Sequence, residues 1–523
     1  MRALLVAPRF PVTYWGFQHA LPYAGARASL PPLGLISVAA LLPADWELRL
    51  VDTNVRELDY ADLAWADVVL TGGMRIQAPS MRAILARAHA AGVPSVVGGP
   101  APTSSPGELA EADVIFRGEL EGRSDELLSA IEAVQSGAGA QVVPPRDAHP
   151  DLADVPVPRF DLLDLDRYAS MSVQYSRGCP YHCEFCDVVE LFGRRPRVKS
   201  SAQVLAELAE LHRLGYHGSV FFVDDNFIGN RKAVLGLLEP LAAWQEERHR
   251  PFNMYTEASV NLAADERLLG AMTAAGFDAV FVGIETPSTA ALAGAGKTHN
   301  LKHDLLESVI RLQRAGLEVM GGFIVGFDQD DERVFEAQRA FIAAAAVPLA
   351  MVGMLTALPG TPLERRLRRE GRLREQSSGD QFARPNFIPS MDEAALLSGY
   401  AGLMTEIYGA DAYYQRVQTF VDRAGRVPHR PVAPAQAAAL VRAIVGIGVL
   451  SRRRKHFWRL FAHTARRAPH NLVRAVTHAI MGEHMIRYTD EELLPRIRRA
   501  QAAGRAERAA VASEPTQAEL RAS

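Results

Sequence analysis

The chain has 523 residues, of which 48% are hydrophobic and 22% charged, and its formal net charge is −3. This length predicts two to four domains, the composition excludes a disordered chain, and the charge excludes a protein that coats nucleic acid. Three cysteines packed into eight positions cannot form a disulfide framework and indicate metal ligation in a reducing compartment. The apolar run before Pro8 is too short for a signal peptide, so we expect a cytoplasmic protein.

Residues 1–136 alternate short β-rich runs with helical patterns, which predicts a doubly wound α/β domain. The expected strands are 4–6, 48–51, 68–71, 95–98 and 114–116. Residues 137–167 contain five prolines and little periodicity, so we expect them to form a linker.

Residues 168–382 return to the same alternation. The expected strands are 173–175, 220–223, 253–257, 279–284, 319–325 and 351–357. Six such units predict a partial, open (β/α)6 version of the parallel barrel, whose ligands lie at the carboxyl ends of the strands. The uncharged stretch 341–358 is divided by Pro348 and predicts a helix end followed by a buried strand, which excludes a membrane span.

Residues 383–499 carry helical patterns only and predict a helical C-terminal domain. The expected helices include 394–408, 435–448 and 455–481. Residues 500–523 are alanine-rich and polar without an apolar face, so we expect a disordered tail.

The cysteines Cys179, Cys183 and Cys186 form a C-x-x-x-C-x-x-C loop directly after the first strand of the second α/β region. A cluster of four irons normally takes four thiolates, so three cysteines leave one iron open. A zinc or structural site is the alternative, but it would require a fourth ligand. His182 is the one candidate inside the loop, and its place beside Cys183 makes a shared metal difficult.

The spacing, the Arg177-Gly178 pair before the first cysteine and Phe185 before the last resemble the radical S-adenosylmethionine superfamily. The resemblance implies a [4Fe-4S] cluster whose open iron is chelated by the methionine group of S-adenosylmethionine, which is then cleaved to a 5'-deoxyadenosyl radical. It also implies that the cosubstrate is bound by Phe185 and by groups that end the next four strands: Asp224, Asp225, Asn226, Glu257, Ser259, Glu285 and Gly322. Taken singly, each polar group could merely cap a helix.

The N-terminal domain resembles the cobalamin-binding domain of cobalamin-dependent radical enzymes. Small residues at strand ends let a backbone lie flat against a large planar ligand. The residues implied for cobalamin are Gly34, Thr71, Gly72, Gly73, Gly98, Gly99, Gly118 and Glu119. A vestigial or nucleotide-binding domain is the alternative. The Asp-x-His sequence at 147–149 lacks the glycine of the histidine-ligated subgroup, so the implied cobalamin has no histidine below cobalt.

The order of segments resembles the cobalamin-dependent (class B) radical family with a helical C-terminal extension, which includes hopanoid C-2 methyltransferases. The matching stretches are 156–161, 177–195, 222–232 and 352–355. The resemblance implies methylation of an unactivated carbon in a small molecule, such as a hopanoid or another polycyclic lipid, with an electron donor such as flavodoxin or ferredoxin. The matched motifs bind cofactors that all members share, so they identify neither the substrate nor the residue that faces cobalt.

Two other functions stay open. One is a cobalamin-dependent rearrangement or cyclisation without net methylation, and the other is a non-enzymatic iron-sulfur redox protein. The stretch 452–458 begins a helix with basic and aromatic residues that would suit a peripheral contact with an anionic membrane, although a solvated helix end with its apolar side packed on the barrel is the more usual explanation.

Overall fold

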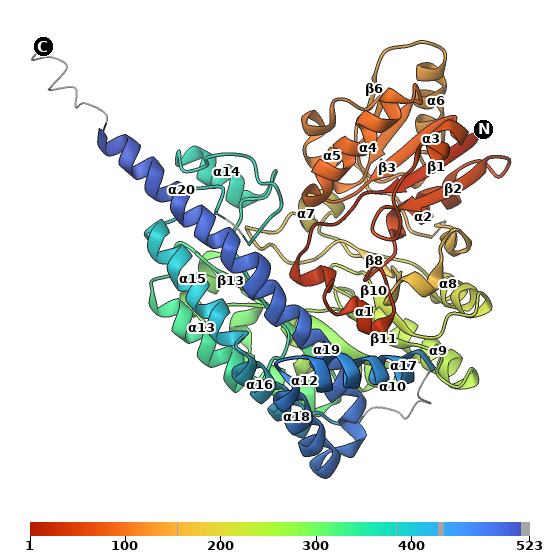
Figure 1. Ribbon diagram of the computed structural model, residues 1–523. Helices are drawn as coiled ribbons and strands as arrows, with labels where there is room; N and C mark the ends of the chain where they lie inside the picture. The colour runs from red at the N-terminus through yellow and green to blue at the C-terminus, as the bar shows by residue number, and fades with distance from the viewer. Residues whose placement is uncertain (154, 383, 427–433, 514–523) are drawn as a thin grey trace, which may run out of the picture.

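The computed structural model describes residues 1–153, 155–382, 384–426 and 434–513. Figure 1 shows an N-terminal α/β domain, a central parallel sheet with outer helices, and a set of C-terminal helices. This architecture confirms the predicted fold class.

The N-terminal domain is a parallel sheet of six strands in the order β2-β1-β3-β4-β5-β6. The strands are β1 (Arg2–Ala7), β2 (Glu47–Asp52), β3 (Val68–Gly72), β4 (Ser95–Gly98), β5 (Val114–Phe116) and β6 (Gln141–Val143). Its main helices are α2 (Leu33–Leu41), α4 (Ala78–Ala90) and α6 (Ser124–Gln135). The strand order reverses between β1 and β3, and in doubly wound sheets the ligand crevice lies at the carboxyl ends of the strands on either side of this reversal.

The five predicted strands of this domain are present, but β6 corrects the expectation of a linker. Gln141–Val143 pairs with β5 as the sixth strand. The sequence of β6 has only two apolar residues, and Pro144 and Pro145 follow them directly, so this stretch resembles a linker until its pairing with β5 is known.

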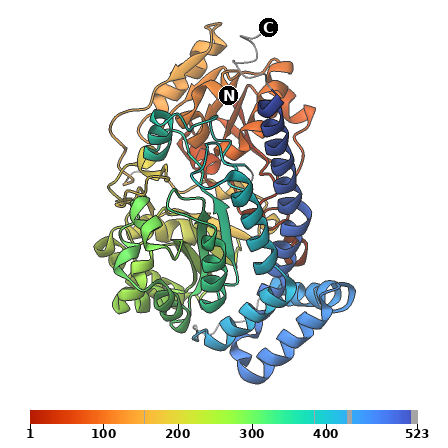
Figure 2. The ribbon, with the colours of Figure 1, turned by 90° about the vertical axis from the view of Figure 1, so that its left-hand side faces the viewer.

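The central sheet consists of six parallel strands in the order β14-β13-β12-β11-β10-β7, and it stays open because β14 and β7 are not paired. The strands are β7 (Ser170–Val173), β10 (Ser219–Phe222), β11 (Asn253–Glu257), β12 (Phe277–Glu285), β13 (Glu318–Val325) and β14 (Ala350–Met354). The helices that follow the strands include α8 (Ser201–Arg213), α9 (Arg231–Glu247), α10 (Glu266–Ala275), α12 (Leu305–Arg314) and α13 (Arg333–Ala344). Figure 2 shows these helices around the outside of the curved sheet.

The C-terminal helices differ from the prediction in two places. They are α15 (Glu393–Ile407), α16 (Ala410–Arg423), α17 (Pro434–Ala443), α18 (Arg454–Arg467), α19 (Leu472–Tyr488) and α20 (Leu494–Ser513). The expected helix 455–481 is broken near Pro469, because proline cannot donate the backbone hydrogen bond of a helix interior.

The expectation of a disordered tail from residue 500 is wrong for residues 500–513, because α20 continues to Ser513. Alanine and arginine favour a helix even without an apolar face. Glu507 also forms an ion pair of 2.6 Å with Arg384. Residues 514–523 of the expected tail lie outside the described residues. Across the described ranges, no helix is long and apolar enough to cross a membrane.

The C-terminal helices share one core with the central sheet and with the segment that follows β1. Tyr14 stacks on Tyr408 at a ring distance of 5.7 Å and meets Tyr488 edge-on at 4.3 Å. The Tyr408 hydroxyl donates to the Ala350 carbonyl of β14 at 2.6 Å. The chain between β1 and α2 therefore leaves its own sheet and joins the N-terminal domain to the other two parts.

Candidate cluster and cofactor site

The cysteine loop lies between β8 (Ser176–Arg177) and α7 (Val188–Phe192) and closes on itself. The Cys179 amide donates to the Gly193 carbonyl at 3.3 Å. Gly178 has φ +92°, and a Cβ at this position would lie 2.8 Å from the same carbonyl oxygen. Both the backbone conformation and the available space therefore require glycine before the first cysteine.

The three thiols are free, half-buried and close enough to influence one another electrostatically. Burial raises the pKa of Cys183 to about 11 and that of Cys186 further above its ordinary value. A metal cluster binds cysteine as thiolate, and its positive irons offset this cost. Three half-buried thiols in one loop therefore fit a [4Fe-4S] cluster that they would hold through three irons.

Asp224 and Asp225, which follow β10, accept hydrogen bonds from the backbone that leads into the cysteine loop. Asp224 is 1% exposed and accepts from the amides of Tyr175 and Ser176. Asp225 accepts from the Gly178 amide at 2.9 Å. Burial raises the pKa of Asp224 to about 7 and that of Asp225 to about 6. Both carboxylates were expected at the cosubstrate, and the structure shows them holding the loop that would carry the cluster.

The next strand ends beside this pair. The Asn226 side-chain oxygen accepts from the Ser259 amide at 3.3 Å, and Asn226 also lies within reach of the Cys179 thiol. The Glu257 carboxylate has no hydrogen-bond or ion-pair partner among the described residues. Burial and the charges of Asp225 and Asp224 raise the pKa of Glu257 to about 8. An unpaired carboxylate in this position is available to a ligand.

Lys297 is a site residue that the sequence analysis did not identify. It forms a buried ion pair with Glu285, which has a φ of +63°, and a Cβ at Gly283 would lie 2.5 Å from atoms of both side chains. The pKa of Lys297 is raised because Glu285 and Cys183 outweigh burial. This cation beside the thiols would favour an anionic cluster and an anionic ligand. A lone lysine after a short helix belongs to no motif, so it could not be recognised from the sequence.

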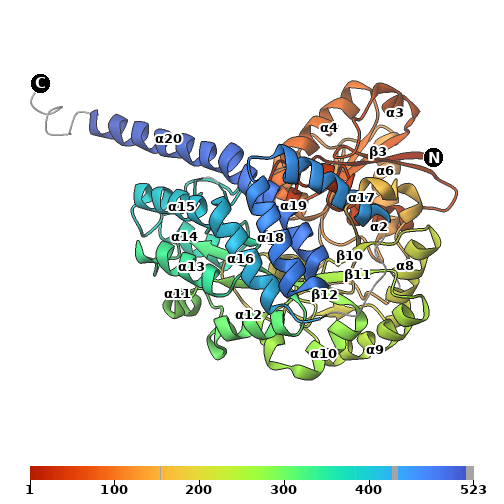
Figure 3. The same cartoon turned by 60° about the horizontal axis from the view of Figure 1, so that its bottom comes forward.

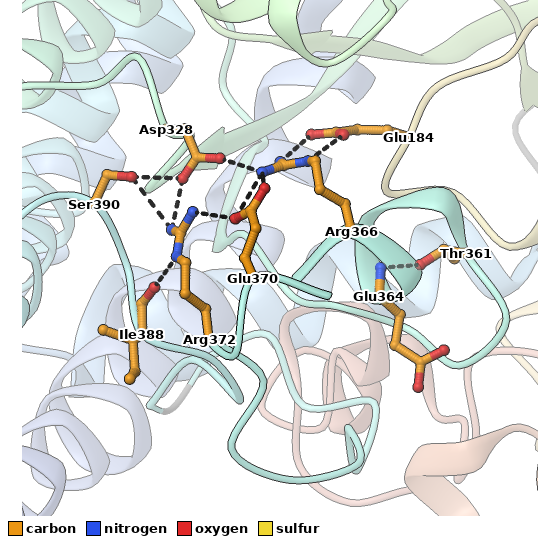
Figure 4. A network of polar contacts seen from close by, with 9 residues as sticks. All are labelled: Glu184, Asp328, Thr361, Glu364, Arg366, Glu370, Arg372, Ile388 and Ser390. Carbon is orange, nitrogen blue, oxygen red and sulfur yellow. Dashed lines mark hydrogen bonds and ion pairs between the residues drawn. The ribbon is translucent and has the colours of Figure 1, made fainter. Parts of the chain in front are cut away.

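An ion-pair network, shown in Figure 4, joins the end of the cysteine loop to two other segments of the chain. Arg366 of α14 (Pro362–Arg369) pairs with Glu184 at 2.9 Å and with Asp328 at 2.7 Å. Arg372 pairs with Asp328 at 2.7 Å and donates to the Ile388 carbonyl. The network links the residue after Cys183 to the segments that follow β13 and β14.

Two further contacts hold the same end of the loop. The Phe185 ring meets Phe327 edge-on at 6.0 Å. The predicted turn at 358–363 brings the Leu363 amide to the Glu184 carbonyl at 2.9 Å, and Thr361 caps α14 by accepting from the Glu364 amide at 3.2 Å. Phe185 and the turn are therefore part of the support of the loop.

Glu119, which was expected at cobalamin, joins the N-terminal domain to the cysteine loop. Its carboxylate pairs with Arg177 at 2.7 Å, Arg197 at 2.9 Å and His149 at 3.0 Å. Glu121 pairs with Arg177 at 2.7 Å. These charges are largely buried, so removing one partner would leave the others in a low dielectric.

The predicted glycines at the carboxyl ends of β3 and β4 lie against one another. A Cβ on Gly72 would lie 2.7 Å from the Gly98 carbonyl oxygen, and one on Gly99 would lie 3.3 Å from the Gly73 amide nitrogen. This mutual packing alone requires small residues. It also leaves bare backbone at the switch-point crevice, which fits the flat approach of a macrocycle such as cobalamin.

The remaining predicted residues of this domain lie around the same edge or apart from it. The Thr71 hydroxyl donates to the Val6 carbonyl at 2.8 Å, and Thr103 accepts from the Gly118 amide at 2.9 Å. Gly34 lies in α2 with open space where a Cβ would be. Thr71 and Gly118 therefore lie at the carboxyl side of β3 and β5, whereas Gly34 lies apart from them in α2.

The inside of the open barrel is apolar below the cluster end. Half-buried Phe221, Tyr255, Phe281 and Met320 alternate along their strands with fully buried residues that pack under the outer helices. Phe281 pairs in register with Glu257 on one side and Met320 on the other, and a Cβ on the predicted Gly322 would lie 2.6 Å from its ring.

Two aromatic contacts shape this wall. Phe221 stacks on Tyr255 at 4.7 Å. Trp15, which is 44% exposed, reaches in from the N-terminal segment and meets Phe281 edge-on at 5.0 Å. The Glu257 carboxylate thus stands between this aromatic wall and the charged groups Asp224, Asp225 and Lys297.

Three family matches agree with this arrangement. Residues 24–128 match the B12 binding domain, residues 173–340 match the radical SAM superfamily, and residues 361–495 match a domain of unknown function, DUF4070. The fold and the three-cysteine loop thus define a radical S-adenosylmethionine enzyme with a cobalamin-binding domain.

Similar proteins narrow this class. The chain is 44% identical to an uncharacterized methyltransferase of Synechocystis sp., over 80% of this chain and 78% of the relative. It is 37% identical to the hopanoid C-2 methylase of Rhodopseudomonas palustris, over 84% of this chain and 82% of that protein. The chain belongs to the family of cobalamin-dependent radical S-adenosylmethionine enzymes that includes this methylase. Its cofactors are a [4Fe-4S] cluster, S-adenosylmethionine and cobalamin, and its class of reaction is C-methylation.

Solved structures share the fold. The cobalamin-dependent radical enzyme OxsB matches with a TM-score of 0.59 at 14% identity, covering 96% of this chain and 83% of that one. The methyltransferase TsrM from Kitasatospora setae matches with a TM-score of 0.55 at 16% identity, covering 91% of this chain and 98% of that one.

Proposed function

We propose that this chain methylates an unactivated carbon of a polycyclic lipid, with a hopanoid as the first candidate. The observation that carries the proposal is the barrel wall of Phe221, Tyr255, Phe281, Met320 and Trp15, which offers apolar and aromatic surface to a substrate. A rigid, apolar ring system buries well against such a wall, whereas a charged substrate would need partners that these side chains lack. The identity to the hopanoid C-2 methylase supports the same choice.

In this proposal the chain's own residues supply position and charge. Cys179, Cys183 and Cys186 hold the cluster, and the unpaired Glu257 and the cation Lys297 bind the cosubstrate beside it. When bound, the cluster and S-adenosylmethionine supply the radical that abstracts hydrogen, and cobalamin supplies the methyl group. The aromatic wall excludes water from the carbon that loses hydrogen.

The reductant belongs to the same proposal. The cluster needs single electrons, so a flavodoxin or ferredoxin would be the partner that delivers them. We also propose that Asn226, Ser259 and Glu285 bind the cosubstrate. The support for this role is their position at the strand ends around Glu257.

The test is the lipid profile of a host that makes hopanoids, compared by mass spectrometry with and without this chain. A Cys186→Ala variant, which loses one thiolate, is the matched control. The proposal expects a lipid heavier by one methyl group with the wild-type chain and none with the variant. Unchanged lipids, together with a methylated product of another chemical class, would refute the substrate while leaving the reaction class intact.

A further inference from the structure

A ridge of large apolar side chains lies exposed on the outer surface of the C-terminal helices. Val441 is 61% exposed, Val445 50%, Val449 57% and Leu450 74%. They lie on α17 and on the π-helical segment Ile444–Leu450 that continues it. A spacing of four residues places the three valines on one side of this helix. Figure 3 shows α17 beside α18 and α19 on the outside of the molecule.

The opposite side of the same helix is also apolar, and it is the side that packs inward. Ala443 and Ile447 are fully buried. The segment 444–450 contains no polar side chain at all. A surface helix normally carries polar residues on its outer face, and a helix that is apolar all round is normally covered on all sides. Among the residues that the structure describes, nothing covers the exposed side of the ridge.

A tryptophan extends the ridge onto the next helix. Trp458 is 43% exposed, and its indole nitrogen donates to the Gly448 carbonyl at 2.9 Å. Its ring also lies 3.3 Å from where a Cβ on Gly448 would stand. Tryptophan with its polar atom satisfied and its ring half-exposed is typical of the boundary between a membrane's headgroups and its acyl chains.

Basic residues predominate around the ridge, although the exposed Asp411 lies 2.9 Å from His456 of α18. Residues 423–482 contain twelve lysines and arginines and no aspartate or glutamate, although the whole chain has a net charge of −3. Arg452, Arg454, Lys455 and Arg459 are exposed and have no acidic partner among the described residues. Arg453, in contrast, pairs with Glu483. Four exposed cations without an acidic partner among the described residues thus lie at 452–459, directly after the ridge segment that ends at Leu450.

The ridge adjoins the segment that reaches the barrel wall. Arg442 donates to the Tyr23 carbonyl at 3.0 Å, and Gly446 packs on the Tyr23 ring. The same N-terminal segment carries Trp15 to Phe281 inside the barrel. A partner that contacts the ridge would therefore lie close to the N-terminal segment that carries Trp15 to the barrel wall.

We propose that Val441, Val445, Val449, Leu450 and Trp458, with Arg452, Arg454, Lys455 and Arg459, form a docking surface for an anionic lipid bilayer. The apolar side chains would enter the interface between headgroups and acyl chains, and the cations would pair with lipid phosphates. Charge decides between candidate occupants, because a second copy of this chain would bring the same free cations against these. The inference concerns where the enzyme lies and does not depend on which substrate it methylates.

The test is co-sedimentation of the full chain with lipid vesicles, which needs no turnover. Vesicles of phosphatidylglycerol mixed with phosphatidylcholine should bind the wild type, vesicles of phosphatidylcholine alone should bind it far less, and added salt should weaken binding. A triple variant with Arg452→Gln, Arg454→Gln and Lys455→Gln should lower the partition coefficient on the order of 100-fold. The changes Val445→Gln, Val449→Gln and Leu450→Gln should lower binding to both kinds of vesicle.

A matched control removes three exposed cations elsewhere that have no acidic partner in the part of the chain that the structure describes, by Arg87→Gln, Lys232→Gln and Arg267→Gln. This variant has the same net charge as the first and should bind vesicles like the wild type, and unfolding curves of all variants verify folding. Equal loss in the control, or no binding of the wild type to anionic vesicles, would overturn the proposal. A wild-type dimer that the valine and leucine changes convert to a monomer would also overturn it, because the ridge would then be an interface between copies.

Discussion

Replacing Arg366 with methionine should loosen the cysteine loop without touching a cysteine. Arg366 is the sole ion-pair partner of Glu184 among the described residues, whereas Asp328 keeps Arg372 and the Ser390 hydroxyl when Arg366 is removed. The Glu184 and Asp328 side chains are each 19% exposed, so the pair lies between the surface and the buried case. Exposed ion pairs contribute near 0.5 kcal/mol and breaking buried ones costs 3–5 kcal/mol, so we expect Arg366→Met to lower the free energy of unfolding by about 2 kcal/mol.

The assay is chemical unfolding together with the iron content after reconstitution, and Arg365→Met is the matched control. Arg365 lies on the same helix but is 54% exposed and pairs with Glu190, so its loss should cost under about 0.5 kcal/mol. Although burial opposes it, hydrogen bonds from Arg372, Ser390 and Arg366 lower the pKa of Asp328 to about 2. The stability from this carboxylate is present above its unfolded pKa and is lost as pH falls towards 2, so the Arg366 effect should shrink below about pH 4.

The reasoning would be refuted if Arg366→Met retained iron and stability as well as Arg365→Met does. If Arg366→Met lost the same stability at pH 3 and pH 7, the ion pair would not be the cause. The loss would then come from packing of the apolar part of the arginine side chain.

Three further changes test other parts of the account. Gly178→Ala should abolish cluster incorporation, measured by iron content, because φ is +92° and the new methyl would contact the Gly193 carbonyl; normal iron loading would contradict this. Glu119→Gln should increase proteolysis between the N-terminal domain and the barrel, because Arg177 loses a buried charged partner; an unchanged digestion pattern would contradict the role of Glu119 in joining the two domains. Burial raises the pKa of Asp330 to about 6. As pH rises from 4 to 6, the unfolding free energy of the wild type should therefore fall by up to about 3 kcal/mol relative to that of Asp330→Asn. A difference between the two proteins that stays constant with pH would exclude this raised pKa.

Most strands of both α/β parts were predictable because they are short apolar runs between turn signals, although the expected strand 173–175 overlaps β7 (Ser170–Val173) only at Val173. The cysteine loop was predictable because its ligands are neighbours in sequence. β6 was missed because none of its three residues is fully buried and two prolines follow it directly, and α20 was missed because helix propensity without an apolar face resembles a tail.

The contacts of the site were less predictable, because they join residues far apart in the sequence. Asp224 was correctly placed at the end of its strand, but its hydrogen bonds to the backbone before Cys179 depend on how β10 lies beside β7. Glu119 was likewise found at a strand end, yet its partners Arg177 and Arg197 come from the other domain. Lys297 has no motif and is recognisable only once the fold brings it to Glu285 and the thiols.

The exposed ridge is another feature that could not be recognised from the sequence alone. The sequence showed a basic and aromatic stretch at 452–458, but it gave no means of telling the exposed valines of α17 from the buried residues between them. Burial separates Val445 from Ile447, and only this separation reveals an apolar face without a partner.

The most direct test of the account is anaerobic turnover of the purified chain with cluster, cobalamin, reductant, S-adenosylmethionine and the candidate lipid, with all products quantified by mass spectrometry. The account predicts that 5'-deoxyadenosine, S-adenosylhomocysteine and a product heavier by one methyl group form in equal amounts. Formation of 5'-deoxyadenosine without S-adenosylhomocysteine, with a product of unchanged carbon count, would contradict C-methylation by this enzyme.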